Sequence, residues 1–437
     1  MPIELSRDAI GIIGCIALLL LVVAGVRVYI AAAIVGLLGI VSIIGWNAGA
    51  GMVGTIPHSK SVNYTLSVLP LFILIGYLAF HAGMTQTLFE ACKRWLGWLP
   101  GGLAVSTIFA VAGFSAVSGA ATAAAAVFAR VAIPEMLKAG YDRRLASGVV
   151  AAGATLDSLI PPSAIMVVYA IIVEASIGKL LVAGFIPGLI SAICYSVIVV
   201  IWSIWNPHVG KPITGYTWRE RFASLPGTLP VTGVILIIFA SMLFGWATPT
   251  EAGALGAFVV YVAALLNRMK WRQLNDALIE TAKLTVMIFA IIWGILIFVR
   301  FLGFAGVPER FSEWVVSLPV PRIVIMLGIL FVYLVLGCFM DAIGMLLLTL
   351  PVFYPAVVKL GYDPIWFGIV VVKMCGVCLL TPPIGLSCFV VAAVRRDIPL
   401  ADVFRGALPF VIADFIAIGI FLAWPWTVTW LPDQLMQ

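Results

Sequence analysis

Long uncharged runs of apolar residues fill most of the chain and are separated by short charged segments. A helix that crosses about 30 Å of hydrocarbon needs roughly 20 apolar residues. Several runs are longer than one crossing requires, which indicates two helices or a re-entrant hairpin. The pattern predicts an all-α polytopic membrane protein with about 11–12 transmembrane helices plus two re-entrant helical hairpins. The longer runs are 9–26, 28–59, 61–89, 95–129, 180–210, 222–250, 374–394 and 415–432, and the shorter ones are 145–156, 158–173, 252–267, 284–299, 323–340 and 342–358.

Composition excludes a soluble enzyme. Apolar residues make up 63% of the chain and charged residues 10%, whereas a soluble domain has roughly 45–50% and about 25%. The net charge of +6 needs no nucleic-acid partner, because cytoplasmic loops of membrane proteins carry excess Lys and Arg. The segment 8–27 is expected to be a retained first span. The seven cysteines lie mostly in apolar runs, where cysteine acts as a small hydrophobe, so neither disulfides nor a metal or redox role is expected.

Basic loops give the orientation and the division of the chain. The loops 206–221 and 267–272 are both basic and are therefore expected on the cytoplasmic side. The two apolar runs between them form one excursion to the periplasmic side. We predict an N-terminal repeat (1–205, first hairpin about 100–130, broken helix 157–163), a two-helix middle with its cytoplasmic loops (206–277), and a C-terminal repeat (278–437, second hairpin about 335–358, broken helix 378–385).

An internal repeat is the strongest signal in the sequence. Residues 131–162 align without gaps on 352–383 at an offset of 221, with 11 identities in 32 positions. The identities include Gly-Tyr-Asp at 140–142 and 361–363, and Pro-Pro at 161–162 and 382–383. Repeats built around broken helices are typical of secondary transporters, whose sites lie at the repeat interface.

Gly-Tyr-Asp allows two interpretations. Intramembrane aspartyl proteases use paired aspartates, so Asp142 and Asp363 make an intramembrane hydrolase an alternative. However, Gly that ends one helix, followed by Asp that caps the next, is the ordinary pattern of a helix–helix loop. We predict that both aspartates are helix caps.

The two Pro-Pro pairs predict helix breaks that bind ions. Proline removes a backbone donor, and carbonyls without partners are tolerated in a membrane only inside protein or along a cavity. A simple kink is the alternative, but two pairs at equivalent positions favour ion sites. The run 113–126 is rich in Gly, Ala, Ser and Thr; it indicates either tight packing or the tip of a hairpin, with 336–344 as its counterpart.

Charged residues within apolar runs are functional candidates by default. Asp157 and Lys373 flank the two breaks, and Asp341 lies in the second hairpin. Arg300 closes the run from 284, where it is either close to the substrate or directed to the membrane surface, and Asp414 lies in the last run. Lys373 and Asp341 are alternatively a structural ion pair. No Walker motif occurs, so uphill transport requires an ion gradient or another subunit.

At these motifs the sequence resembles the large membrane subunit of tripartite ATP-independent periplasmic (TRAP) transporters. The similar segments include Ser115–Gly119, Pro134–Asp142, Leu159–Ser163, Thr248–Ala252, Gly337–Asp341 and Thr381–Gly385, in family order along the chain. The resemblance implies an inner-membrane protein with an inverted-repeat elevator fold that is not an enzyme. It also implies a periplasmic binding protein that delivers a small organic acid, such as a C4-dicarboxylate, and a small four-helix membrane subunit.

The resemblance further implies symport with Na⁺ at two sites. The first is expected at Ser115, Ser118, Asp157, Ile160 and Pro161, the second at Gly337, Cys378, Thr381 and Ile384, with Asp341, Lys373 and Arg300 as substrate candidates. Asp157 and Cys378 stand where the family usually has Gly, and Ser387 where Asn is common. The alternative of the same class is a stand-alone elevator carrier of dicarboxylates, coupled to Na⁺ or H⁺.

Overall fold

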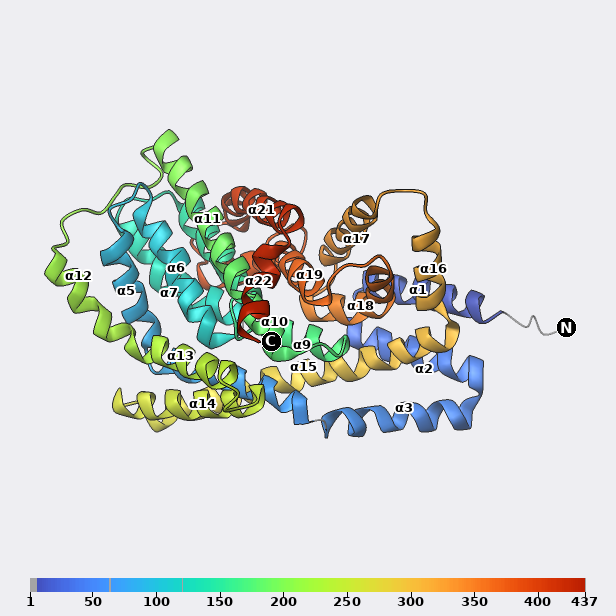
Figure 1. The fold of residues 1–437 in the computed structure, drawn as a ribbon. Helices are drawn as coiled ribbons and strands as arrows, with labels where there is room; N and C mark the ends of the chain where they lie inside the picture. The colour runs from blue at the N-terminus through green and yellow to red at the C-terminus, as the bar shows by residue number, and fades with distance from the viewer. Residues whose placement is uncertain (1–5, 63, 120, 437) are drawn as a thin grey trace.

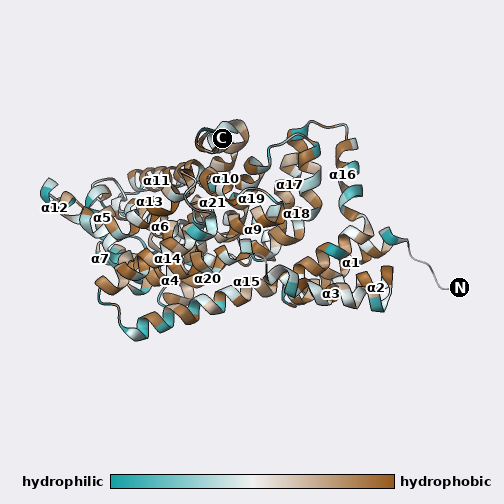
Figure 2. Ribbon diagram, turned by 60° about the horizontal axis from the view of Figure 1, so that its bottom comes forward, coloured by the Kyte–Doolittle hydropathy of each residue, from teal (hydrophilic) through white to brown (hydrophobic). Residues whose placement is uncertain are grey.

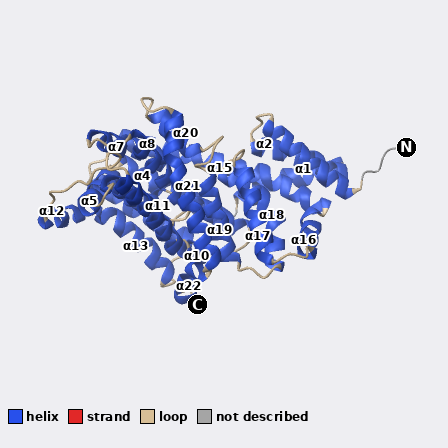
Figure 3. Ribbon diagram, turned by 90° about the horizontal axis from the view of Figure 1, so that it is seen from above, coloured by secondary structure: helices blue, strands red, loops and turns tan. Residues whose placement is uncertain are grey.

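The protein is helical throughout the part that the structure describes. The structure, a computed structural model, describes residues 6–62, 64–119 and 121–436, and every regular element in these ranges is a helix (Figures 1 and 3). Figure 2 shows apolar helix bodies, with hydrophilic residues concentrated at helix ends and on short segments such as α12 and α16. The all-α polytopic fold class is therefore confirmed.

Each of the three predicted parts of the chain contains several helices. The N-terminal part contains α1 (Arg7–Val23), α2 (Val28–Ile44), α3 (Trp46–Ser61), η1 (Tyr64–Ser67), α4 (Val68–His81), α5 (Met84–Leu96), α6 (Gly102–Ser118), α7 (Ala121–Lys138), α8 (Arg143–Thr155), η2 (Leu156–Ser158), α9 (Ala164–Ile172), α10 (Ile177–Ala183) and α11 (Phe185–Trp205). The middle contains α12 (Trp218–Ser224), η3 (Leu225–Thr228), α13 (Leu229–Leu243) and α14 (Pro249–Leu266). The C-terminal part contains α15 (Trp271–Ala305), α16 (Val307–Ser317), α17 (Arg322–Gly337), α18 (Ala342–Lys359), α19 (Pro364–Cys378), α20 (Leu386–Val394), α21 (Leu400–Ala423) and α22 (Trp426–Leu435).

The sequence repeat is also a structural repeat. Adding 221 to the bounds of α7, 121 and 138, gives 342 and 359, the bounds of α18. The same offset relates α5 to α16, α6 to α17, α8 to α19 and α9 to α20 within two residues at each end. Each repeat thus has a short amphipathic helix (α5 or α16, called here the arm helix), a helical hairpin, and a helix broken at Pro-Pro. The second hairpin spans 322–359; the predicted range of 335–358 covered little more than its tip and second helix.

Contacts at the helix ends show that the two repeats run in opposite directions. The Tyr141 hydroxyl donates to the carbonyl of Lys211 at 2.6 Å, so the start of α8 lies against the basic loop after α11. The Tyr169 hydroxyl, on α9 beyond the break, donates to the carbonyl of Pro364 at the start of α19, at 2.7 Å. The broken helix α19–α20 therefore starts at the side where α8–α9 ends. In Figure 1 the two hairpins lie on either side of the central α9, α19 and α21.

Membrane crossings are built from helices of different lengths. Among the residues that the structure describes, six continuous helical stretches are long and apolar enough to span alone: 177–205, 218–243, 249–266, 271–305, 342–359 and 400–423. Shorter apolar helices, among them α6, α17 and α19, belong to the hairpins and broken helices. The predicted total of 11–12 spans stays a prediction, because length alone does not identify crossings made of two short pieces.

Glycines let helix backbones meet at several places, and two examples join segments far apart in the sequence. A Cβ on Gly294 of α15 would collide with the carbonyl of Tyr29, at the N-terminal end of α2. A Cβ on Gly148 of α8 would collide with the backbone of Gly406 on α21. Small residues allow such close approach in membranes, where packing and not water exclusion holds helices together. These contacts join α15 to the N-terminal helices and α21 to the first broken helix.

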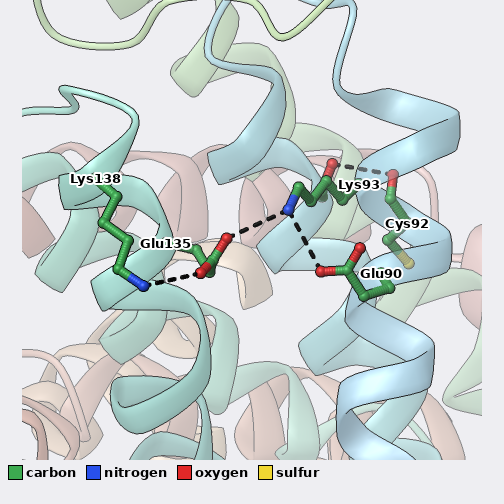
Figure 4. A network of polar contacts seen from close by, with 6 residues as sticks. Glu90, Cys92, Lys93, Glu135 and Lys138 are labelled. Atoms are coloured by element: carbon green, nitrogen blue, oxygen red, sulfur yellow. Dashed lines mark hydrogen bonds and ion pairs between the residues drawn. The ribbon is translucent and has the colours of Figure 1, made fainter. Parts of the chain in front are cut away.

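The arm helices are held to their hairpins in different ways. In the first repeat, Lys93 Nζ of α5 lies 3.3 Å from Glu135 Oε2 of α7 and 3.3 Å from Glu90 Oε1, and Lys138 Nζ lies 3.6 Å from Glu135 Oε1 (Figure 4). In the second repeat, the ring of Phe311 on α16 lies 5.3 Å from that of Phe353 on α18.

Candidate ion-binding site

The first predicted ion site is assembled by the tip of the first hairpin and the break after α8. The Ser118 hydroxyl, at the end of α6, donates to Asp157 Oδ1 at 3.3 Å. Gly119 follows in the left-handed region (φ 58°), and a Cβ there would lie 3.1 Å from the carbonyl oxygen of Pro162. The structure therefore brings the predicted residues of α6 next to those of the break, although about 40 positions separate them in sequence.

The prolines explain the break. In a continuous helix the carbonyls of Asp157 and Ser158 would accept from the amides of residues 161 and 162, but both are proline and have none. The chain instead forms a short 3₁₀ turn, in which the amides of Leu159 and Ile160 both donate to the carbonyl of Leu156, at 3.0 and 2.8 Å. The Pro-Pro peptide bond is cis here and in the second break.

Burial and donor chemistry fit a hard cation. Ser115, Ser118 and Asp157 are exposed by 0%, 2% and 2%. Within the described residues, the Ser115 hydroxyl oxygen and that of Ser163 are buried without a hydrogen-bond partner. Hydroxyl, carbonyl and carboxylate oxygens are the ligands of hard cations, and a buried polar atom without a partner is costly unless something binds it. The residues present therefore fit Na⁺.

The second predicted site is more open. A Cβ on Gly337 would overlap the Cys378 sulfur, so the end of α17 lies directly on the second broken helix. The Thr381 hydroxyl donates back to the carbonyl of Val377 at 2.8 Å. Pro382, Pro383 and Ile384 are exposed. Gly337 and Cys378 are thus in contact as predicted, whereas the Ile384 side chain lies at the surface.

Ser387 is buried beside the second break, unlike the exposed Pro382, Pro383 and Ile384. Its amide donates to the carbonyl of Leu379 at 3.1 Å, which satisfies one carbonyl that Pro383 leaves without a donor. Within the described residues its buried hydroxyl has no hydrogen-bond partner. This hydroxyl adds an oxygen donor beside the second break.

The three substrate candidates do not gather at one place. Lys373 Nζ lies 2.5 Å from Asp414 Oδ1, and the side chains are 2% and 0% exposed. The alternative of a Lys373–Asp341 bridge is therefore wrong, because Asp341 caps α18 by accepting from the amide of Gly344 at 2.9 Å. Arg300 is exposed on α15. Their roles toward a substrate remain predictions.

The aspartates of Gly-Tyr-Asp are helix caps. Asp142 accepts from the amide of Arg144 at 2.7 Å and Asp363 from the amide of Trp366 at 2.7 Å. Each carboxylate therefore satisfies a free amide of a first helical turn. The capping interpretation is confirmed. The hydrolase alternative rested on these two aspartates alone and is therefore left without support.

Sequence reasoning missed two partners of the buried charges. The Tyr195 hydroxyl donates to Asp414 Oδ1 at 2.5 Å and lies 3.0 Å from the Thr155 hydroxyl. A signal for the ion pair existed, because a lysine inside a membrane needs a counterion and Asp414 was one of few acids in an apolar run. No comparable signal pointed to Tyr195.

A cavity of about 440 Å³ lies between α15, α18 and the turn after α9. Its walls are mainly apolar, with Glu174 among the residues at the turn. None of the predicted ion or substrate residues lines it. The cavity is therefore separate from both breaks.

Comparison with known proteins identifies the family. The family model described as "Tripartite ATP-independent periplasmic transporter, DctM component" matches residues 12–427. The C4-dicarboxylate TRAP transporter large permease protein DctM of Pseudomonas aeruginosa is 33% identical over 377 residues, which cover 86% of this chain and 88% of the relative. The sialic acid TRAP transporter large permease protein SiaM of Vibrio cholerae is 30% identical over 376 residues, 86% of this chain and 87% of the relative.

A solved structure shares the fold. The YdaH transporter of Alcanivorax borkumensis superimposes with a TM-score of 0.58 at 14% identity, over 96% of this chain and 99% of that chain. At this identity the likeness concerns the fold alone.

Proposed function

The chain belongs to the DctM-component family of tripartite ATP-independent periplasmic transporters, and from this premise we propose that it imports a small organic anion together with Na⁺. It is the large membrane subunit of such a transporter and lies in the inner membrane; it is not an enzyme. The single observation that carries the proposal is the buried set of oxygen donors where the first hairpin tip meets the first break. Cation sites at broken helices are typical of secondary transporters.

The substrate class and the partners follow from the family. Relatives are named for C4-dicarboxylates and sialic acid, which are carboxylates, and for isethionate, which is a sulfonate. A small organic anion is the proposed cargo, with a C4-dicarboxylate as the first candidate. A tripartite transporter has two further components: a periplasmic binding protein that delivers the anion and a small membrane subunit, for which we propose four helices. The exposed apolar helix surfaces face the lipid bilayer.

The proposed mechanism is an elevator movement. The two hairpins and two broken helices carry the ion and substrate sites. We propose that they move as one body, together with α11 and α21, against the remaining helices, since Tyr195 of α11 and Asp414 of α21 contact the broken helices. Two features support this division. Each hairpin is connected to the rest of the chain by an arm helix, α5 or α16, and the two broken helices meet, since a Cβ on Gly376 would lie 3.1 Å from the Ser158 hydroxyl.

The test of ion coupling is uptake by the assembled system in proteoliposomes. A Na⁺ gradient should drive accumulation of a C4-dicarboxylate, whereas a K⁺ gradient of equal size should not. Equal uptake with K⁺ in place of Na⁺, driven by a proton gradient alone, would reject Na⁺ coupling. Proton coupling through Asp157 is the version that would then replace it.

This test does not distinguish a tripartite transporter from a stand-alone carrier that works without a binding protein. Reconstitution of this chain without the binding protein decides between these two alternatives. We expect no uptake by the chain alone and uptake when binding protein and small subunit are added. Full uptake by the chain alone would favour the stand-alone carrier.

A further inference from the structure

A buried polar network connects the two broken helices. It starts at Lys373 on α19, whose ammonium lies 2.5 Å from Asp414 on α21. Asp414 also accepts from the Tyr195 hydroxyl on α11 at 2.5 Å, and this hydroxyl lies 3.0 Å from that of Thr155 at the end of α8. The network therefore ends two residues before Asp157, where the first break begins.

Further contacts fix this end of α8. The carbonyl of Thr155 accepts from the Ser158 hydroxyl at 2.7 Å, so Thr155 and the 3₁₀ turn are held together. The Lys373 ammonium also lies 5.1 Å from the centre of the Tyr195 ring, within the range of a cation–π contact. Lys373, Asp414, Tyr195 and Thr155 are each at most 2% exposed. Lys373 and Asp414 thus set the position of Tyr195, and Tyr195 contacts the residue from which the break starts.

The internal repeat has no charge at the position equivalent to Lys373. At the offset of 221, Lys373 on α19 corresponds to Ala152 on α8. Replacing a buried ion pair by apolar residues is often neutral or stabilising in proteins. A lysine that occurs in one repeat alone, and whose partners reach the start of the first break, is better explained by that break than by packing.

We propose that Lys373, Asp414 and Tyr195 form a positioning unit for the first ion site. Through Thr155 the unit holds the start of the break in the geometry that binds Na⁺, and because Lys373 belongs to the second broken helix, the affinity of the first site depends on the position of that helix. This inference rests on the proposed Na⁺ coupling. The three residues act through Thr155 and do not contact the ion themselves.

The first test is Tyr195→Phe, which removes the hydroxyl and keeps the ring. Its readout is the Na⁺ concentration that gives half-maximal thermal stabilisation of the full-length protein in detergent, since a ligand that binds only the folded state raises its stability. We expect this concentration to rise about fivefold, the lower end of typical coupling between sites. Thr155→Val removes the other hydroxyl and should have the same effect.

The matched control is Tyr169→Phe. Tyr169 is buried and its hydroxyl also makes one strong contact, to the carbonyl of Pro364, which is at the start of α19 and not at a break. We expect it to change overall stability without a change in Na⁺ affinity. Equal Na⁺ titrations for Tyr195→Phe and Tyr169→Phe would overturn the positioning unit. A wild-type protein that Na⁺ does not stabilise would instead overturn the proposed function and this inference with it.

A second test separates positioning from folding. Lys373→Met alone leaves a buried carboxylate without its cation and should lower the yield of folded protein. Lys373→Met combined with Asp414→Leu replaces the ion pair by apolar side chains of similar size and should restore the yield, while Na⁺ affinity stays weakened. If the double variant has wild-type Na⁺ affinity, Lys373 and Asp414 only neutralise each other's buried charge and do not act on the ion site. This result would overturn the proposal.

Discussion

The two breaks have the same backbone design but different surroundings. Around the first, Asp157, Ser158, Pro161, Pro162 and Ser163 are all buried, and the Ser118 hydroxyl donates to the Asp157 carboxylate. Around the second, the two prolines and Ile384 are exposed, and a thiol, Cys378, stands where the first break has Asp157. Duplication thus preserved the helix break, which follows from Pro-Pro, while the side chains around it diverged.

The arm helices diverged in the same way. In the first repeat the arm helix is tied to the hairpin by ion pairs around Lys93 and Glu135, and in the second by the rings of Phe311 and Phe353. At the offset of 221, Glu135 corresponds to Ala356 and Phe353 to Ala132. The first repeat thus has charged groups at its break and at its arm helix, whereas the same two places of the second repeat have a thiol and a pair of rings.

The sharpest test of this comparison is Asp157→Asn against Cys378→Ser. Asn keeps the shape of Asp and removes the charge, so we expect about a tenfold loss of apparent Na⁺ affinity, the size of a lost hydrogen bond to a charged group. Protons compete with Na⁺ for a carboxylate, so the variant should also respond less to pH. Cys378→Ser should leave both properties close to wild type.

Na⁺-dependent uptake at several pH values gives this measurement. Identical Na⁺ titrations for Asp157→Asn and wild type would leave Asp157 as a structural residue. A larger effect of Cys378→Ser than of Asp157→Asn would contradict the comparison, because Na⁺ binding would then depend more on the thiol of the second break than on the carboxylate of the first.

Hydroxyl removal should produce a smaller difference in the same direction. Ser118→Ala and Thr381→Ala are both expected to raise the Na⁺ requirement while the assembled complex stays intact. Ser118→Ala should have the larger effect, about fivefold, since its hydroxyl contacts Asp157 and one hydrogen bond is worth about 1 kcal/mol. The Thr381 hydroxyl is already bound to the carbonyl of Val377. Unchanged Na⁺ dependence in both variants would show that the two hydroxyls contribute to packing and not to Na⁺ binding.

Local sequence signals predicted much of this arrangement. Gly-Tyr-Asp and Pro-Pro act on their own backbone, so the caps at Asp142 and Asp363 and the two breaks were readable from the chain. The offset of 221 extended them to both repeats. The contacts of Ser118 with Asp157 and of Gly337 with Cys378 agree with the grouping that the family resemblance implied, which brought distant segments together.

Local sequence signals do not predict which distant residues pair or which side chains are buried. Lys373 and Asp414 lie 41 positions apart, and Asp414 is outside the aligned repeat, so nothing in the sequence favours Asp414 over Asp341 as the partner of Lys373. The ionic contact of the first arm helix and the aromatic contact of the second depend on which faces of α5 and α16 meet the hairpins. Composition alone does not determine those faces.

The arm helices offer a test by salt. Glu135→Gln removes one partner of Lys93 and should cost up to about 1 kcal/mol, because partly exposed ion pairs contribute little. The loss should shrink at high ionic strength, which screens exposed charges. Phe353→Leu should cost about the same through the lost ring pair but show no salt dependence. Thermal unfolding at low and high salt checks both, and equal salt dependence of the two variants would contradict the ionic–aromatic distinction.

The smallest effect is expected where the two repeats are most alike, at the caps Asp142 and Asp363. Each accepts a backbone amide at 2.7 Å, and Asn caps helices almost as well as Asp, so the double variant Asp142→Asn/Asp363→Asn should lose only about 0.5 kcal/mol, mainly the attraction of a negative charge to the helix start. Uptake by the assembled system should stay close to wild type, and the two single variants should have similar effects. This outcome would also dismiss paired catalytic aspartates, since a hydrolase that used them would lose all activity. Loss of uptake in a double variant that is still folded would show that these carboxylates do more than cap, and the two repeats would then share a charged function at their helix starts as well as a backbone design.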